Sequence, residues 1–595
     1  MRALLMRSFI KASEVVDRRI GWDKLPPWLG IGVLVGIRDA LREHNLYDTY
    51  EGDPPAAPAH YPAEYLTNRT ADGSYNDLAE PSMGMANTRF GRNVAPALGR
   101  PEPPPGLMDP NPRLVSTELL LRDEFRPAET LNILAAAWLQ FETHDWFSHG
   151  TDDNRMLKIP VPEGDDWDGE TIDVPATPVD PQSPPGRPSF VNRETHWWDA
   201  SQIYGSSVEF QQHIRTPAEC NDGKVRIDQD GFIDVAPAVI QSSGGADGWW
   251  VGFELMGTIF MREHNAICDR LRAAYPEWTG DQIFNKARLI NAALLAKIHT
   301  VEWTPAILDH PTLHIGMRAN WFGLAGEKVG QLVGRIGASD LVSGIPGSQT
   351  DHHSAAYSIT EDFVTVYRMH PLIPDDYTFE PITGDSAPQG LSFGDLHGVA
   401  NSRGVLKRLG MTNCLYSLGI AHPGAVTLHN SPKFMRQFHS EKHLIDLIAV
   451  DILRSRERGV PRYNEFRRQL RLKPATSFEE ISGGDRATAE KMREIYGGDI
   501  EKVDTTVGMF GEKLPPGFGF SDTAFRIFVL MATRRLKSDR FYTVDFTPQV
   551  YTPEGMAWIA DNTMTSVLLR HDPALEPVLR NVKNPFAPWP RMRHA

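Results

Sequence analysis

The chain has 595 residues, of which 41% are hydrophobic and 23% charged, so it can bury a large core and is neither disordered nor fibrous. It carries 61 basic and 76 acidic residues, a net charge of −15, which argues against general nucleic-acid binding because a phosphate backbone would be repelled. Three scattered cysteines, Cys220, Cys268 and Cys414, give neither a disulfide framework nor a CxxC metal site. A reducing compartment is the simpler interpretation, and we expect a cytoplasmic protein.

Residues 1–60 are predicted to form an N-terminal helical segment, and residues 61–595 the main domain. The first part of this segment has the pattern of an amphipathic helix, with Leu4, Leu5, Phe9 and Ile10 set against Arg2, Arg7 and Lys11. Such a helix either contacts a membrane surface peripherally or packs on the body, and the sequence leaves both open. The longest apolar run, residues 28–37, is far shorter than the roughly 20 residues that cross a bilayer.

Proline-rich stretches at residues 52–62, 101–112 and 160–188 are predicted to be loops. The third is long, acidic and without a helix or strand pattern, and we expect a structureless excursion within one domain rather than a linker. Helical periodicity dominates elsewhere, in the segments 129–149, 250–274, 281–304, 358–370, 440–456, 464–472, 488–496 and 523–536. The sequence therefore predicts a mainly α fold, one large helical domain with few short strands.

A short helix is predicted just before Pro371. Ser358 followed by Glu361 is typical of a capping box, and Pro371 disfavours helix at the residue before it. Tyr367 and His370 are three residues apart, so we expect them on one face of this helix. Two interpretations stay open: a hydrogen-bonded pair in the core, or a haem-iron ligand with a redox-active tyrosine beside it.

A second helix carries Gln140 and His144 four residues apart, hence on one face. Three alanines at 135–137 precede them, and their small side chains would let a flat cofactor approach the backbone. The pair therefore belongs either to a haem cavity or to a core in which glutamine satisfies a buried histidine.

Asp145 follows His144 directly and points away from it, because successive helix residues lie about 100° apart. Further along, a loop offers oxygen atoms at every second residue, from Thr195, the carbonyl of Trp197, Asp199 and Ser201. Hard cations such as Ca²⁺ bind several carboxylate, hydroxyl and carbonyl oxygens. Asp145 and this loop would suit calcium, with an ordinary Thr/Ser-rich turn as the alternative.

Motifs for other cofactors are missing from the sequence. It has no HExxH, no Cys/His cluster, no GxxxxGK[ST], no GxSxG, and no GxGxxG after a strand pattern. Zinc, nucleotide, nicotinamide and α/β-hydrolase chemistry lose support, and haem is the metal centre that the sequence favours.

Several of these segments together resemble the animal-type haem peroxidase superfamily. The likeness lies in a distal-histidine helix, a calcium loop and two further signatures, at residues 140–145, 195–206, 261–265 and 454–464. Within that superfamily the chain is most similar to the fatty-acid α-dioxygenases. The stretches that carry this closer likeness are 69–73, 90–93, 297–304, 367–370 and 534–541, so the resemblance spans nearly the whole chain.

The resemblance implies a role for each matching residue. It makes His144 the distal histidine, with Gln140 beside it, His370 the proximal ligand of the haem iron, and Tyr367 the radical carrier. The residues expected to hold the substrate carboxylate are His299, Thr304, Arg534 and Arg540; Arg534 is preferred to its neighbour Arg535 because of its six-residue separation from Arg540.

The implied reaction is α-dioxygenation of a long-chain fatty acid. A tyrosyl radical takes a hydrogen atom from the carbon beside the carboxylate, and O₂ adds there to give a 2-hydroperoxy acid, which can lose CO₂ to an aldehyde one carbon shorter. A peroxide is the expected activator, and no obligate protein partner is evident. The alternatives are a general haem peroxidase that oxidises small molecules, or a haem- or lipid-binding protein without turnover.

Three positions depart from the wider superfamily. Thr143 stands where an acidic haem anchor is expected, and the segment 247–250 (DGWW) replaces the one that carries the second anchor and a distal arginine. We therefore expect haem b bound without covalent links. Asp451 stands where an asparagine usually supports the proximal histidine, which leaves that histidine's partner open.

Overall fold

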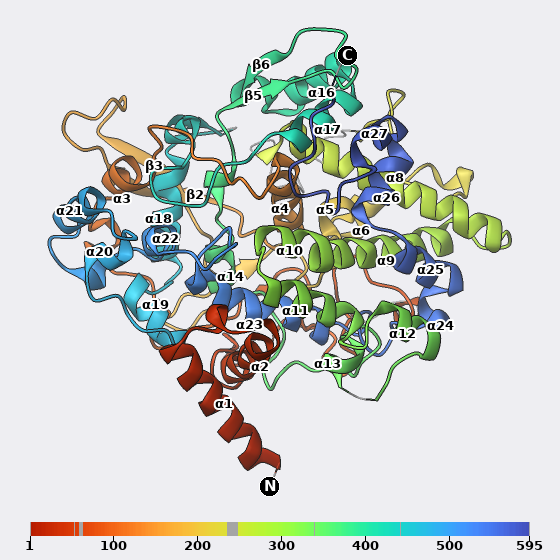
Figure 1. Ribbon diagram of the computed structural model, residues 1–595, viewed down its shortest axis with the longest axis horizontal. Coiled ribbons are helices and arrows are strands. Elements are labelled where there is room, and N and C mark those ends of the chain that lie inside the picture. Colours follow the sequence, from red (N-terminus) through yellow and green to blue (C-terminus); the bar gives the residue numbers. More distant parts are fainter. Residues whose placement is uncertain are drawn as a thin grey trace.

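The structure is a computed structural model that describes residues 2–52, 54–58, 63–234, 248–337, 339–440 and 442–593. Helices make up its body (Figure 1). The strands form only antiparallel pairs, at the periphery. They are β1 (Thr88–Arg89) with β4 (Val191–Asn192), β2 (Asp152–Pro160) with β3 (Thr171–Ala176), β5 (Asp376–Phe379) with β6 (Gln389–Ser392), and β7 (Phe438–His439) with β8 (Leu444–Ile445). The predicted mainly α class is confirmed.

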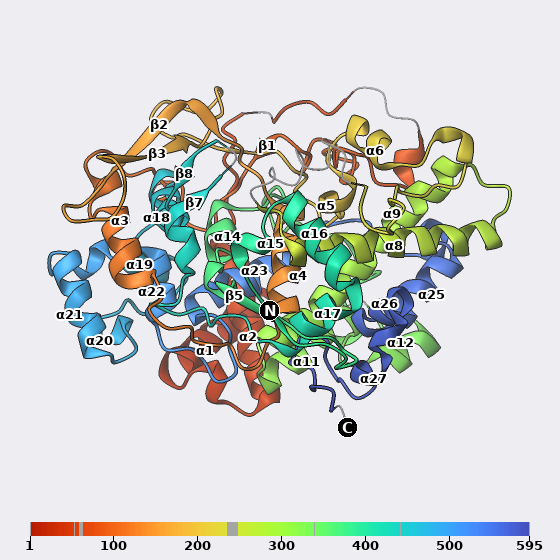
Figure 2. The same ribbon diagram turned by 90° about the horizontal axis from the view of Figure 1, so that it is seen from above.

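Long helices surround α4 (Ile133–Trp146), which lies near the centre in two perpendicular views (Figures 1 and 2). It packs on α8 (Val251–Ala274), which pairs with α9 (Gly280–Ile298). The side chain of Asn132 caps α4 by accepting a hydrogen bond from the N–H of Ala135 (3.2 Å). Residues 133–139 of α4 are all buried, as expected for a helix enclosed by others. One contiguous apolar core therefore surrounds this helix.

The other helices cover this centre. They are α3 (Pro112–Val115), α5 (Ser201–Tyr204), α6 (Val208–Ile214), α12 (Glu327–Val333), α13 (Asp340–Ser343), α15 (Phe393–Leu396), α16 (Val399–Leu409), α17 (Met411–Ile420), α18 (Leu447–Glu457), α19 (Tyr463–Gln469), α20 (Phe478–Ile481), α21 (Arg486–Ile495), α22 (Thr505–Gly511), α23 (Asp522–Ser538), α24 (Pro548–Tyr551), α25 (Pro553–Asp561), α26 (Met564–His571) and α27 (Glu576–Leu579).

The helix predicted as 281–304 is interrupted near its end. After α9 the chain makes a π-helical turn, His299–Trp303, before α10 (Thr304–Ile307) and α11 (Pro311–Phe322). Pro305 lies in the first turn of α10 and has no N–H to donate, so the regular ladder is interrupted here. His299 sits at the start of this turn, with only 3% of its surface exposed.

The helix before Pro371 is shorter than predicted. α14 spans Glu361–Val366, and its cap is Thr360, whose hydroxyl accepts from the N–H of Phe363 (3.1 Å). Tyr367 is the residue at which α14 ends, and His370 opens a separate 3₁₀ turn. The expectation that Tyr367 and His370 share one helix face is therefore wrong. Pro371 disfavours helical backbone at His370, but α14 ends at Val366, four residues before His370.

The acidic stretch 160–188 is not structureless. Its middle forms β3, which pairs with β2 in the register Leu157↔Val174 and Ile159↔Ile172. Ile172 and Val174 pack on α18. This short alternation of apolar residues was obscured by the surrounding prolines and acids.

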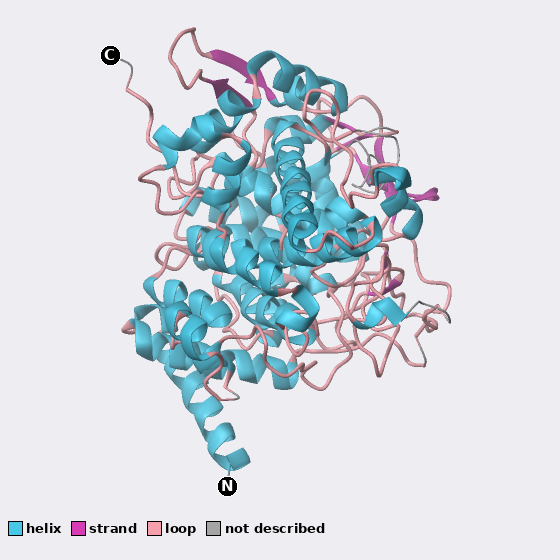
Figure 3. Ribbon diagram, turned by 90° about the vertical axis from the view of Figure 1, so that its right-hand side faces the viewer, coloured by secondary structure: helices cyan, strands magenta, loops and turns pink. Residues whose placement is uncertain are grey.

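The N-terminal segment consists of α1 (Arg2–Arg19) and α2 (Pro27–His44). Helix α2 packs on α11 and α23, and its buried residues Ile37 and Leu41 join the main core. Helix α1 lies on α2 and extends away from the body (Figures 1 and 3). Among the described residues, none of the helices combines the length and apolar character that crossing a bilayer requires.

Candidate functional site

A cavity of about 340 Å³ separates α4 from the chain around Tyr367 and His370. Most of its walls are apolar. The residues that line it are Ala136, Leu139, Gln140, Thr143, His144, Gly248, Trp250, Tyr367, Met369, His370, Leu372, Ile373, Phe393, Phe434, Met435, Phe438, Ser440, Ile445 and Leu447. The structure thus brings Gln140, His144, Tyr367 and His370 to one cavity, although α14 ends before His370.

On the α4 side, Gln140 is held from two directions. Its amide NH₂ donates to the carbonyl of Gly248 (2.7 Å), and its carbonyl accepts from the indole N–H of Trp250. His144 packs against Phe253, with 4.8 Å between ring centroids. A side chain at Gly248 would place its Cβ 3.1 Å from the His144 imidazole, so the absence of one leaves room for the histidine. Asp247 lies outside the described residues.

On the opposite side, His370 has a fixed tautomer. Its Nδ1–H donates to the carboxylate of Asp451 (2.5 Å), and that carboxylate also pairs with Arg368. Burial alone would raise the pKa of Asp451, but His370 and Arg368 hold it below its usual value. Since Nδ1 carries the proton, Nε2 keeps its lone pair for a metal. Asp451 is thus the partner that the sequence left open, and the set fits the fifth ligand of a haem iron.

Tyr367 lies between the cavity and a cluster of tryptophans. It is 6% exposed, and its ring is 5.1 Å from that of Trp146 and 4.5 Å from that of Phe363. Burial raises the pKa of its phenol, which keeps the O–H bond intact at neutral pH. A protonated phenol is the form that can give up and regain a hydrogen atom.

His299 sits in the same cluster as a neutral imidazole. Its Nδ1 accepts the indole N–H of Trp138 (3.1 Å), its ring stacks on Trp303 (4.5 Å), and Trp146 and Trp198 contact it edge-on. Burial first, and then the charge of Arg535, lowers its pKa well below the ordinary value. Because Nδ1 is an acceptor, Nε2 carries the proton and is a donor. The hydroxyl of Thr304 donates to the His299 carbonyl (2.9 Å) and so braces the π turn.

The arginine beside His299 is Arg535, not Arg534 or Arg540. The Arg535 guanidinium stacks on Trp146 (4.2 Å) and Trp198 (4.3 Å), both of which contact His299. Arg534 instead donates to the carbonyls of residues 352, 355 and 356. Arg540 pairs with Asp545 and with carbonyls of residues 65, 66 and 75. The six-residue spacing that favoured Arg534 was a poor guide because both arginines are committed elsewhere.

Three buried N–H groups in this cluster find no acceptor within the described part of the chain. They are Nε and Nη2 of Arg535 and the indole N–H of Trp146. Leaving such donors unpaired costs free energy, so an anion placed here would gain several hydrogen bonds. Trp146 is the common neighbour, since its ring contacts Tyr367, His299 and Arg535.

Comparison with known proteins agrees with this geometry. The animal haem peroxidase family model matches residues 68–583. The Oryza sativa alpha-dioxygenase PIOX is 36% identical over 96% of this chain and 94% of its own length, and Arabidopsis thaliana alpha-dioxygenase 2 is 35% identical over 97% and 92%. This chain belongs to the animal haem peroxidase family. Within the family it is an alpha-dioxygenase, hence an oxidoreductase that uses haem.

Solved alpha-dioxygenase structures share the whole fold. The crystal structure of an Oryza sativa fatty acid alpha-dioxygenase, a Tyr-to-Phe variant with palmitic acid, superposes with a TM-score of 0.91 at 33% identity, over 98% of this chain and 97% of that one. The Arabidopsis thaliana fatty acid alpha-dioxygenase gives 0.90 at 34% identity, over 100% and 94%. The single peroxidase-like domain is thus common to this chain and these enzymes.

The expected calcium loop lies against the far side of α4. Asp145 accepts from the N–H (2.6 Å) and the hydroxyl (2.9 Å) of Ser201, and Asp199 accepts from Thr195 (2.9 Å) and pairs with Arg288 (3.0 Å). Burial, with the charge of Asp199 next, raises the pKa of Asp145 well above its usual value. Its Oδ2 is buried and meets no donor among the residues described. An orphaned carboxylate oxygen among hydroxyls fits a cation.

The carboxylates of this loop are too few to indicate a metal site by themselves. No group of three or more His, Cys, Asp or Glu side chains in the described ranges is arranged to hold a metal. The expected set has only Asp145 and Asp199 as carboxylates, and its other oxygens come from Thr195, Ser201 and the carbonyl of Trp197. Hydroxyl and carbonyl ligands are common at calcium sites.

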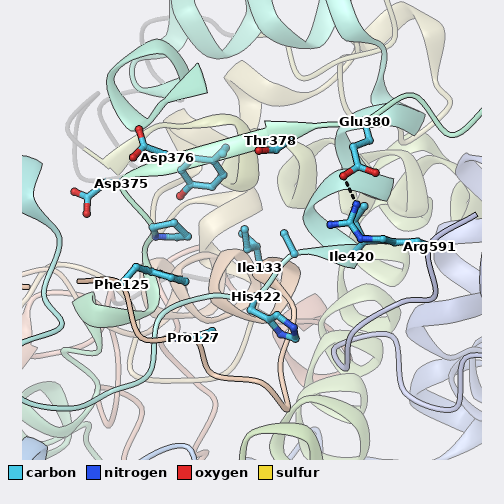
Figure 4. A pocket seen from close by; sticks show the side chains of 13 residues that line it. Phe125, Pro127, Ile133, Asp375, Asp376, Thr378, Glu380, Ile420, His422 and Arg591 are labelled. Carbon is cyan, nitrogen blue, oxygen red and sulfur yellow. Dashed lines mark hydrogen bonds and ion pairs between the residues drawn. The ribbon is translucent and has the colours of Figure 1, made fainter. Parts of the chain in front are cut away.

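A second hollow, of about 520 Å³, opens beside β5 (Figure 4). Its acids Asp375 and Glu380 pair with Arg122 and Arg591, and the latter pair is drawn in the figure. No residue of the predicted site lines it. Gln140, His144, Tyr367 and His370 line the cavity beside α4 instead.

Proposed function

We propose that this chain oxygenates long-chain fatty acids at the carbon next to the carboxylate, with Tyr367 as the group that exchanges a hydrogen atom with that carbon. The supporting observation is that Tyr367, His299 and Arg535 all contact the ring of Trp146. A carboxylate bound by the last two residues would hold its neighbouring carbon close to the phenol. Orientation of this kind restricts the reaction to one carbon.

The carboxylate is held by charge and by unpaired donors. Arg535 supplies the positive charge and two N–H groups, His299 supplies Nε2–H, and Trp146 supplies its indole N–H. Charge-assisted hydrogen bonds are about twice as strong as neutral ones, and the aromatic walls exclude water. Arg535 thus takes the place that the sequence suggested for Arg534 and Arg540.

The cavity between His144 and His370 would hold haem b without covalent links, and Nε2 of His370 would be the ligand that the protein offers to the iron. Residue 143 is a threonine, so it offers no carboxylate for an ester bond, and its hydroxyl donates to the carbonyl of Gln140 (2.9 Å). When bound, haem supplies the one-electron oxidising chemistry that converts the Tyr367 phenol to a radical. His144, oriented next to Gln140, moves the proton of the activating peroxide.

The atoms balance in each proposed step at the substrate. Tyr367 takes one hydrogen atom from the α carbon, O₂ adds to that carbon, and the hydrogen atom returns to give a 2-hydroperoxy acid. Loss of CO₂ and water then gives an aldehyde one carbon shorter. Ca²⁺ would be held by Asp145, Asp199 and their neighbouring oxygens, and there it would tie α4 to the 195–201 loop and so support the helix that carries His144.

Replacing Tyr367 by Phe tests this function. Oxygen uptake with palmitate should fall to background, while peroxide reduction by the haem-loaded enzyme continues, because the phenol acts only in the substrate step. Tyr377→Phe is the matched control, since Tyr377 is also a buried tyrosine but lies on the wall of the second hollow. It should keep oxygen uptake. Unchanged formation of the 2-hydroperoxy acid by Tyr367→Phe would contradict the proposal.

A further inference from the structure

The ring of Trp146 offers a route by which an oxidising equivalent could leave Tyr367. The two ring centroids lie 5.1 Å apart, edge to face. Trp146 in turn contacts the ring of Trp198, with 6.0 Å between centroids. Indole and phenol side chains lose one electron at similar potentials. A radical that waits on Tyr367 for substrate therefore has a short path toward the two tryptophans.

The indole N–H groups of these tryptophans differ in their acceptors. The N–H of Trp198 donates to the carboxylate of Glu142 (2.8 Å), which could take up the indole proton. The N–H of Trp146 is buried and meets no acceptor among the residues that the structure describes. An oxidised Trp146 would therefore keep its proton and remain a cation. An oxidised Trp198 could lose its proton to Glu142 and persist as a neutral radical, so it would act as a trap.

The guanidinium of Arg535 places a positive charge against both indoles. It lies 4.2 Å from the ring centroid of Trp146 and 4.3 Å from that of Trp198. The side chain is buried, and its Nε and Nη2 meet no acceptor in the described part of the chain, so no anion bonded to these atoms offsets the charge. Like charges about 4 Å apart repel strongly in a medium of low dielectric. The oxidation of Trp146 to a cation is therefore disfavoured.

Oxidation of Tyr367 does not meet the same repulsion. Tyr367 lines the cavity beside α4, so its phenol proton can leave together with the electron, and the product is a neutral radical. To pass the radical on, Tyr367 would take one electron from Trp146 and one proton from the cavity. That step would restore the phenol and leave a cation at Trp146, next to Arg535. The positive charge thus opposes the second oxidation and not the first.

We propose that Arg535 confines the oxidising equivalent to Tyr367 while the site is free of substrate, because its charge keeps Trp146 from being oxidised and so blocks the route to Trp198. This second role of Arg535 rests on the proposed function, in which Tyr367 carries the radical. It is distinct from carboxylate binding, since it acts before an acid enters the site.

The test is electron paramagnetic resonance of the haem-loaded enzyme, frozen at set times after peroxide is added without fatty acid. Tryptophan deuterated on the indole ring distinguishes the two radicals, because only a tryptophan signal narrows. The unaltered chain should give a tyrosyl signal that is lost in Tyr367→Phe. In Arg535→Met the ratio of tryptophan to tyrosine radical should rise about tenfold or more, since a charge is removed at about 4 Å. Adding Trp146→Phe to Arg535→Met should restore the tyrosyl signal.

Arg534→Met is the matched control. The Arg534 guanidinium lies 5.4 Å from the ring of Tyr357 and bonds backbone carbonyls, so its removal should leave the radical on Tyr367. Trp146→Phe alone tests the proposal with Arg535 in place. The lifetime of the Tyr367 radical should be unchanged in it, because a confined radical does not use Trp146. The Soret band of each variant checks that haem is bound.

Three results would overturn the proposal and leave the proposed function intact. They are a tyrosyl signal unchanged in Arg535→Met, a longer-lived Tyr367 radical in Trp146→Phe, and a tryptophan signal that survives when both substitutions are combined. The third would place the radical on another indole, such as Trp250 on the cavity wall. A signal in the unaltered chain that does not depend on Tyr367 would overturn the proposed function as well.

Discussion

The two sides of Tyr367 differ in how their polar groups are satisfied. Toward the cavity, His370, Asp451 and Arg368 form a closed set in which the carboxylate accepts from both partners. Toward the tryptophan cluster, Arg535 and Trp146 present buried N–H groups with no acceptor in the described part of the chain. In the first region, which is partly exposed to the cavity, the buried carboxylate is fully paired, whereas in the second, buried region the donors lack acceptors.

This difference fits two roles, one region orienting a metal ligand and the other binding an anion. A closed set fixes one side chain in one orientation, which is what a metal ligand needs. An open set of donors is costly until an anion completes it, which is what a site for a fatty-acid carboxylate needs.

The largest effect is expected in the open set. Arg535→Met removes the charge that faces the carboxylate, so kcat/KM for palmitate should fall about a hundredfold or more, since hydrogen bonds to charged groups contribute about 1.5–3 kcal/mol each. Arg534→Met is the control, because it breaks bonds to backbone carbonyls and should lower the melting temperature with little change in KM. Oxygen uptake against palmitate concentration gives kcat and KM for both variants, and thermal unfolding gives their melting temperatures. An equal rise in KM in Arg535→Met and Arg534→Met would show that Arg535 does not bind the carboxylate.

A smaller effect is expected in the closed set. Asp451→Asn replaces the carboxylate by a neutral acceptor, so haem affinity should fall about 10- to 100-fold and the reduction potential should rise as His370 becomes a weaker donor. Asp504→Asn, at a buried carboxylate that pairs with Arg456 and Arg462, should destabilise the fold and leave the haem titration unchanged. An unaltered potential and affinity in Asp451→Asn would show that the closed set does not tune the ligand.

A buried histidine whose two ring nitrogens are both hydrogen-bonded, far from the site, predicts a pH dependence of stability. His264 donates from Nε2 to the carbonyl of Gly223 (3.0 Å), its Nδ1 accepts from the hydroxyl of Tyr204 (2.8 Å), and burial lowers its pKa to about 4. The unfolded chain takes up this proton near pH 6.5, so stability is complete above that pH and falls by about 1.4 kcal/mol per unit as pH drops toward 4. Denaturant unfolding of His264→Gln should show a shallower slope between pH 6.5 and 4. A slope equal to that of the unaltered chain would contradict this.

The smallest effect is expected at Gly248. An alanine there would bring its Cβ to 3.1 Å from the His144 imidazole and 3.4 Å from the Gln140 amide, so the histidine must shift by a few tenths of an ångström. Peroxide reduction should slow by a few-fold. Gly316→Ala, in α11 with open space around it, should not change the rate. A normal rate in Gly248→Ala would mean that the position of His144 is not critical.

The sequence predicts the fold class and the family because both depend on repeated local signals. Helical periodicity extends over most of the chain, and the motifs around His144 and His370 keep the order found in the family. The hairpin of β2 and β3 was missed because Ile172 and Val174 are only two residues in an acidic, proline-rich stretch. The end of α14 was misplaced because Pro371 restricts only the residue before it.

Helical periodicity alone could not decide between Arg534 and Arg535. Arg534 follows Leu530 by four residues, and Arg535 follows Met531 by four; both of these apolar residues are buried, so the pattern cannot rank the two arginines. Trp146 was missed for a related reason. It extends an already apolar helix, and only its contacts with Tyr367 and His299 distinguish it from an ordinary core residue.

The π turn after α9 constrains how this protein can vary. Removing one residue between Ile298 and Thr304 would remove the extra residue of the π turn and rotate everything on one side of the deletion by about 100° relative to the other. Either the His299 imidazole would leave the tryptophans or α11 would leave α2. A one-residue deletion at this turn should therefore be incompatible with binding of a fatty-acid carboxylate at His299.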